Sequence, residues 1–338
     1  LSTSAPTSAS TSTPIRPANQ EIRMSVSRLS AFAKPRVFAP VVTPFTAGLD
    51  VDAARFVAFC RWLVGQGAGL ALFGTNSEAN SLSLAERHAL LDQVLEAGID
   101  PAQMLPGTGA CALPDAIALT RHAAEAGCAG ALMLPPFFYK GVSDDGLFAY
   151  YSDVIQAVGS DQLRVLLYHI PQFTGVPITH TLIERLIAAY PQTVVGIKDS
   201  SGDWANTAAM LEKFPGFAVF PASEVLLGKA LPLGAAGCIS ATANIQPHAI
   251  ASLLNAATLE ERAMWEGKVA TVRLAVQAQP MIPALKSIVA HFAHDPEWTR
   301  VRPPLTPMNP AQSGALLQQL QALDFSMPSV ASLAVVAA

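Results

Sequence analysis

The chain alternates short apolar runs with longer amphipathic stretches, and this alternation constrains the fold more than any other feature of the sequence. Each run is rich in aliphatic residues, and the spacers carry apolar residues at helical spacing. Residues 52–67, for example, begin with an aspartate and end with a glycine, as helices commonly do. Eight runs fit the description: RVFAPVVTPF, GLALFGT, QMLPGTG, GALMLPP, RVLLYHIP, VVGIKDS, FAVFPAS and AAGCISA.

Eight strand–helix units in a chain of 338 residues predict an α/β fold, namely a (β/α)8 TIM barrel with additional C-terminal helices. A doubly wound sheet is the alternative, although no G-x-G-x-x-G or P-loop segment follows any run. The predicted boundaries are a disordered Ser/Thr/Pro-rich leader at 1–32, the barrel at 33–245, a helical extension at 246–325 and a tail at 326–338.

The composition argues against two classes of partner. Hydrophobic residues make up 51% of the chain and charged residues 14%, which favours a well-filled core over disorder. A net charge of −4 and the lack of a Lys/Arg cluster give no electrostatic footprint for nucleic acid. Every apolar run is interrupted before the roughly 18 residues that a membrane helix needs. The sequence therefore predicts neither a nucleic-acid nor a membrane partner.

The cysteines are scattered and carry no metal or redox signature. None of them forms the close pair that zinc sites or dithiol motifs require. They are Cys60, Cys111, Cys128 and Cys238, each within an apolar or small-residue stretch. We expect reduced core thiols in a cytoplasmic protein.

One lysine follows a predicted strand at the position where barrel enzymes place their chemistry. Lys198 comes directly after the apolar run VVGI and directly before the polar turn DSSGD. Lysines at strand ends usually bury an aliphatic stem and leave the ammonium in water. At the carboxyl end of a barrel strand, however, a partly desolvated amine can act as a nucleophile. Hydroxyls and the phenols of Tyr139 and Tyr168 follow other strands, and a phenol can supply the weak acid that imine formation needs.

Three ordered segments resemble motifs of the pyruvate-dependent class I aldolases and lyases, the family of dihydrodipicolinate synthase and N-acetylneuraminate lyase. The segments are GTNSEANSLSLAER, YHIPQFTGVPI and VVGIKDSSGD. Two later segments, GAAGCISATANIQP and RPPLTP, also resemble family elements, so the likeness runs from about residue 37 to 308. The resemblance implies a barrel enzyme that acts on pyruvate or a related 2-oxo acid and needs no cofactor and no metal.

The resemblance also implies roles for individual residues. Lys198 would form the imine with the substrate ketone, Tyr168 would shuttle protons beside it, and Thr75 would hydrogen-bond Tyr168. Asn76 and Ser77 would hold the substrate carboxylate, an anion suited to preorganised donors. The remaining residues predicted to bind substrate are Phe138, Tyr139, His169, Phe173 and Ile239.

The chain departs from the family pattern at positions that bear on the substrate. The pair at 76–77 replaces the usual Thr-Gly. Phe173 stands where dihydrodipicolinate synthase carries an arginine for the carboxylate of its aldehyde substrate, and an apolar ring cannot pair with that group. Phe138 stands where a neighbouring subunit's tyrosine completes a proton relay, which leaves adjacent Tyr139 as a substitute. His169 replaces an asparagine, and it either donates to substrate or bonds the backbone.

Several functions remain open at this point. The aromatic pocket suits an aromatic or apolar aldehyde more obviously than a sugar-derived 2-keto-3-deoxy acid, so a hydratase-aldolase stands beside a sugar-acid lyase and a dehydratase. The alternative is 4-hydroxy-tetrahydrodipicolinate synthase. A non-catalytic barrel is a second alternative, although it need not keep the lysine, tyrosine and threonine together. A metal-dependent class II aldolase would draw its ligands from His169, Glu78, Asp199 and Glu224, which lack tight ligand spacing. The expected partners are a small 2-oxo acid and further copies of the chain, as a dimer or tetramer.

Overall fold

The computed structural model describes the backbone of residues 32–336 and the side chains of residues 32–333. The predicted leader lies outside the described residues except for its last position, Phe32. This residue is buried, and its ring packs edge-on against Phe220 at 5.5 Å and Phe38 at 6.4 Å. The leader prediction is therefore corrected at its C-terminal end, because Phe32 belongs to the packed core.

Within the described residues, seven regular strands form two parallel sheets. They pair in the orders β2-β1-β7 and β3-β4-β5-β6, and every pairing is parallel. The strands are β1 (Arg36–Ala39), β2 (Gly69–Leu70), β3 (Ala131–Met133), β4 (Val165–His169), β5 (Val194–Asp199), β6 (Ala218–Pro221) and β7 (Gly237–Ile239). The first and last strands are neighbours, as a closed barrel requires.

The predicted run at 103–109 joins the two sheets without forming a regular strand. Leu105 N–H donates to the Leu70 carbonyl at 2.8 Å, and on the other side Leu132 N–H donates to the Pro106 carbonyl at 2.8 Å. Proline lacks an N–H group, so this segment cannot complete a ladder. Between β6 and β7, Ala236 N–H donates to the Val219 carbonyl at 3.0 Å. Hydrogen bonds therefore link all eight predicted segments into a ring, and the barrel prediction is confirmed.

The barrel interior is filled by side chains from every segment of the ring. They form one buried apolar cluster that includes Tyr168 and the predicted substrate-binding residue Ile239. Its members on the eight segments include Phe38, Ala71, Leu105, Leu132, Leu166, Val195, Phe220 and Ile239. This is the layered core that the alternation of inward and outward residues produces in such barrels.

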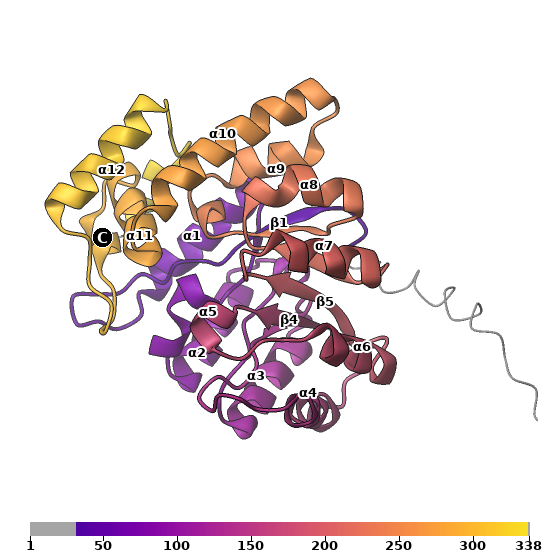
Figure 1. Ribbon diagram of the computed structural model, residues 1–338. Helices are drawn as coiled ribbons and strands as arrows, with labels where there is room; N and C mark the ends of the chain where they lie inside the picture. Colours follow the sequence, from indigo (N-terminus) through magenta and orange to yellow (C-terminus); the bar gives the residue numbers. More distant parts are fainter. Residues whose placement is uncertain (1–31, 337–338) are drawn as a thin grey trace, which may run out of the picture.

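Helices follow the strands and pack outside them (Figure 1). Asp52 caps the first helix by accepting a hydrogen bond from Arg55 N–H, and Gly67 follows its end at φ 88°, as the sequence predicted. The helices of the ring are α1 (Ala53–Gly65), α2 (Leu84–Glu96), α3 (Leu113–Glu125), α4 (Asp144–Val158), α5 (Pro171–Thr174), α6 (His180–Ala189), α7 (Trp204–Lys213), α8 (Leu227–Ala230) and α9 (Pro247–Asn255).

Three further helices follow, α10 (Leu259–Gln277), α11 (Met281–Phe292) and α12 (Pro310–Ala322). In Figure 1 they gather, orange to yellow, at the side of the molecule where α1 lies. The predicted extension began at residue 246, but α9 packs on β1 and α10 packs on α9. Beyond the predicted boundary at 326, Met327, Val330 and Leu333 are buried within the same core as α1. Among the described residues, no helix is both long and apolar enough to span a membrane.

The cysteines are all free thiols, but they do not all lie in the core. Cys60 and Cys238 are buried, Cys128 is half-buried, and Cys111 is exposed just before α3. The prediction of a core position is therefore wrong for Cys111, because its stretch of small residues forms the loop after the third segment and not part of that segment. The cytoplasmic setting stays a prediction.

Candidate active site

Lys198 and Tyr168 lie opposite each other at the carboxyl ends of β5 and β4, where the strand register pairs them. Lys198 Nζ donates a hydrogen bond to the Tyr168 hydroxyl at 3.1 Å and lies 4.2 Å from the centre of the Tyr168 ring. The hydroxyl of Thr75 is 2.9 Å from the same phenol oxygen. Lys198 is 3% exposed and Tyr168 is 2% exposed. The three residues predicted to be catalytic thus form one hydrogen-bonded chain, largely shielded from water.

The predicted carboxylate-binding loop is a single turn of 3₁₀ helix, η3 (Thr75–Ser77). The Ser77 side chain accepts a hydrogen bond from Gly74 N–H at 3.2 Å, and Thr43 Oγ1 donates to the Ser77 carbonyl at 2.7 Å. Asn76 is half-buried and faces a cavity. Ser77 therefore shapes the turn, whereas Asn76 presents its amide to the space beside Thr75.

That cavity has a volume of about 440 Å³ and opens beside Thr75 and Asn76. Phe173, the first turn of α11 and the proline-rich loop before α12 line it, and among these described residues there is no Lys, Arg, Asp or Glu. Phe138 and Tyr139 pack edge-to-face at 5.3 Å but do not line it. Phe138, Tyr139 and Phe173 are 72%, 73% and 71% exposed. In a single chain, the predicted aromatic wall therefore stands at the rim and does not enclose a pocket.

His169 makes the backbone contact that was one of its two predicted alternatives. Its Nδ1 accepts a hydrogen bond from Ile178 N–H at 3.1 Å, and the side chain is buried. Burial lowers the pKa of His169, against the opposing influence of the Asp199 carboxylate. Asp199 in turn accepts hydrogen bonds from Thr207 at 2.7 Å and Asn206 at 3.1 Å. These contacts anchor the loops behind the strand ends.

The Glu224 carboxylate is also fully engaged. Ser240 and Thr242 donate hydrogen bonds to it, Gln246 Nε2 donates at 2.9 Å, and Arg273 lies 3.7 Å away. Across residues 32–336, no group of three or more His, Cys, Asp or Glu side chains is arranged to hold a metal ion. The candidate ligands of the class II alternative are therefore dispersed and bound to other partners.

The sequence profile of the Dihydrodipicolinate synthetase family matches residues 33–323. The chain belongs to this family. A relative from Chloroflexus aurantiacus, named an uncharacterized DapA-like lyase, is 35% identical over 288 residues, which cover 84% of this chain and 95% of the relative.

Solved structures of the dihydrodipicolinate synthetase family share the fold of the chain. The chain is similar to dihydrodipicolinate synthase from Agrobacterium tumefaciens, with 32% identity, a TM-score of 0.79, and coverage of 86% of this chain and 99% of that one. It is also similar to YagE, a prophage protein from E. coli K12 solved in complex with pyruvate, with 27% identity, a TM-score of 0.79 and the same coverage. The chain is therefore an enzyme, a lyase of the class I aldolase type, and the non-catalytic alternative is set aside.

Sequence reasoning missed one pair of charges that supports the site of this family member. Lys286 Nζ donates to Glu78 Oε1 at 2.6 Å, and both side chains are completely buried. Arg302 N–H donates to the other Glu78 oxygen at 3.0 Å, while its guanidinium binds Glu86 and holds the pKa of Glu86 at about 2. The ring of Phe45 lies 4.4 Å from Lys286 Nζ and 4.7 Å from the guanidinium carbon of Arg302. A lone lysine within the apolar helix sequence MIPALKSIVAHF was the signal that could have revealed the pair.

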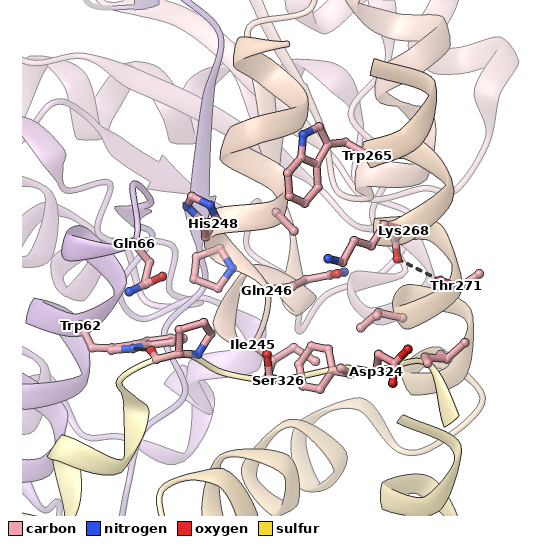
Figure 2. Close-up of a pocket in the computed structure, with 16 residues that line it drawn as sticks. Trp62, Gln66, Ile245, Gln246, His248, Trp265, Lys268, Thr271, Asp324 and Ser326 are labelled. Atoms are coloured by element: carbon pink, nitrogen blue, oxygen red, sulfur yellow. Dashed lines mark hydrogen bonds between the residues drawn. The ribbon is translucent and has the colours of Figure 1, made fainter. Parts of the chain in front are cut away.

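A second cavity, of about 130 Å³, lies between α9, α10 and the segment that follows α12. Figure 2 shows Trp265 and Lys268 on one side of it and Trp62 on the other, with His248 and Asp324 at its edges. None of the residues predicted to form the active site lines this cavity. The chemistry of the chain is therefore assigned to the mouth of the barrel.

Proposed function

We propose that the chain is a Schiff-base lyase or aldolase in which Lys198 forms an imine with C2 of pyruvate or a related 2-oxo acid. The observation that carries this proposal is the chain of hydrogen bonds from Lys198 Nζ to the Tyr168 hydroxyl and on to Thr75 Oγ1. An amine that attacks a ketone gives a carbinolamine, whose hydroxyl must be protonated to leave as water. Tyr168 touches the amine and is held by Thr75, so it is positioned to move that proton.

The substrate carboxylate would lie against the loop that carries Asn76. The adjoining cavity has an uncharged lining and an exposed aromatic ring, Phe173, at its edge. Such a surface accommodates an apolar or aromatic aldehyde more readily than an acidic one. We therefore favour a hydratase-aldolase, a sugar-acid lyase or a dehydratase over 4-hydroxy-tetrahydrodipicolinate synthase, which remains the second candidate because relatives with that name match the chain.

The same proposal includes assembly into a dimer or tetramer. Phe138 and Tyr139 form an aromatic pair that is largely exposed in the single chain. Adjacent exposed aromatic side chains are typical of surfaces that a partner covers. Sedimentation analysis should give the mass of an oligomer, and replacing both rings with serine should shift the population toward the monomer.

The test of the imine is reductive trapping. Borohydride added in the presence of pyruvate should attach one reduced pyruvyl unit to the chain, and peptide mapping should place it on Lys198. Lys198→Arg should abolish the adduct, whereas Lys229→Arg, a control at a surface lysine, should not. An unmodified wild-type chain, under conditions that label the Agrobacterium tumefaciens relative, would refute the proposal. Loss of turnover in EDTA with no adduct would favour the class II alternative instead.

A further inference from the structure

The loop that carries Thr75 is bracketed by two backbone positions that side chains other than glycine rarely adopt. Phe73 has φ 56°, and Glu78 has φ 55° and ψ 34°. Both lie in the left-handed region, where a Cβ atom is crowded by the neighbouring carbonyl group. Such positions persist only where the surrounding structure holds them. The turn between them, η3, therefore needs an external support.

Glu78 receives that support through both of its carboxylate oxygens. One oxygen binds Lys286 of α11, and the other binds the backbone N–H of Arg302. Lys286 has no exposed surface, and desolvation lowers its pKa to about 8 against the influence of Glu78. A buried ammonium without a counter-charge is strongly unfavourable. Glu78 consequently cannot leave its place without leaving a buried charge unpaired, so the ion pair fixes the end of the loop.

The fixed end of the loop lies three residues from Thr75. Within that interval the chain makes a single 3₁₀ turn, closed by Glu78 N–H donating to the Thr75 carbonyl at 3.1 Å. A displacement of Glu78 is therefore passed directly to Thr75 and to its 2.9 Å contact with the Tyr168 hydroxyl. It is passed equally to Asn76, which faces the cavity.

We propose that Glu78 and Lys286 are positioning residues, and that their buried ion pair sets the place of Thr75 and Asn76 relative to Lys198. The inference rests on the proposed function for its catalytic consequence, but the placement of the loop can be measured without turnover. Neither side chain reaches the reacting atoms in this arrangement. They act through the loop, whose Thr75 hydroxyl contacts Tyr168 and whose Asn76 lines the cavity.

The experiment compares Lys286→Met and Glu78→Gln with a matched control, Lys213→Met. The control also removes a Lys–Glu contact, that of Lys213 with Glu184 at 3.0 Å, but on the surface. The pyruvate concentration for half-maximal borohydride trapping is measured well below each melting temperature. We expect it to rise by about 10- to 150-fold in both site variants, the cost of losing one charge-assisted hydrogen bond from the loop to the substrate carboxylate, and to be unchanged in the control.

Hydrogen exchange provides the second readout. Amides in a peptide covering 72–82 should exchange faster in both site variants, while those of β4 and β5 keep their wild-type rates. A pair that served stability alone would lower the melting temperature and leave both half-saturation and loop exchange unchanged, and that result would overturn the proposal.

Two further outcomes are also decisive. If Lys286→Met does not fold, Glu78→Gln decides the question, since glutamine still offers an acceptor to the Arg302 N–H. If the wild-type chain traps no pyruvate, the proposed function fails while loop exchange still tests the positioning. Faster exchange then supports the positioning role, and unchanged exchange refutes it.

Discussion

The contact between Thr75 and Tyr168 makes a prediction that a double-mutant cycle can test. Thr75→Val removes one hydroxyl at nearly constant volume, and so removes the partner 2.9 Å from the Tyr168 hydroxyl. A neutral hydrogen bond of this kind contributes about 1 kcal/mol, so the rate of imine formation should fall roughly fivefold. Tyr168→Phe removes the proposed proton carrier itself and should slow the step by about 10²- to 10⁴-fold.

The two changes should not add. If Thr75 acts only by holding the phenol, Thr75→Val should cost nothing once Tyr168 is phenylalanine, and the coupling energy should equal the roughly 1 kcal/mol single effect. Single-turnover trapping at saturating pyruvate, followed by intact mass, measures each rate. An equal loss from Thr75→Val in both backgrounds would show that Thr75 acts on substrate directly. Near-normal rates for Tyr168→Phe would move the proton transfer to another residue, and Tyr139 would be examined first.

Further predictions concern substrate choice, stability and strand packing. Wild-type protein should condense pyruvate with aspartate semialdehyde poorly, and Phe173→Arg should raise product formation by about tenfold, the low end for a charge-assisted bond because the site is exposed. Lys286→Met should lower the urea-derived free energy of unfolding by about 3–5 kcal/mol, since Glu78 is left unpaired; no loss would contradict the buried pair. Glu86→Gln should lower the free energy of unfolding at neutral pH. Because the pKa of Glu86 is depressed in the folded chain, the stability it contributes is lost as the folded form is protonated. The difference in free energy of unfolding between variant and wild type should therefore shrink as the pH falls from 4.5 to about 2. A pH-independent difference would exclude that origin. Gly196→Ala places a Cβ 2.5 Å from the carbonyl oxygen of Ala218 in β6. The shift of β5 should slow borohydride trapping of pyruvate at Lys198 by about 10²-fold. An unchanged trapping rate would show that β5 and β6 can move apart without disturbing the site.

The central part of the site was predictable because its residues stand at strand ends. The ends of parallel strands converge at one mouth of a barrel, so Lys198 and Tyr168 could be placed together without knowing any distance. Their register pairing and the contact with Thr75 confirm that placement. The eight runs were predictable because short apolar runs, typical of buried strands, alternate with stretches whose apolar residues recur at helical spacing.

The remainder depended on contacts between distant parts of the chain. The run at 103–109 is apolar enough to resemble a strand, but Pro106 removes a donor and the segment stays irregular. Lys286 resembled an ordinary helical lysine, because its counter-charge lies 208 residues earlier. The exposure of Phe138 and Phe173 depends on how loops fold back, which local sequence does not determine. Contacts between residues that are far apart in the chain could therefore not be predicted from the sequence.

The 208-residue separation of Glu78 and Lys286 has a consequence for the order of events during synthesis. A growing chain that has emerged as far as β7 contains Lys198, Tyr168 and Thr75, and it can pair β7 with β1. It still lacks the ammonium that holds the loop. Because domains are made from the N-terminus onward, Lys198, the proposed nucleophile, is synthesised well before the loop beside it is held in place. An incomplete chain should therefore trap keto acids only weakly until α11 docks and fixes the loop.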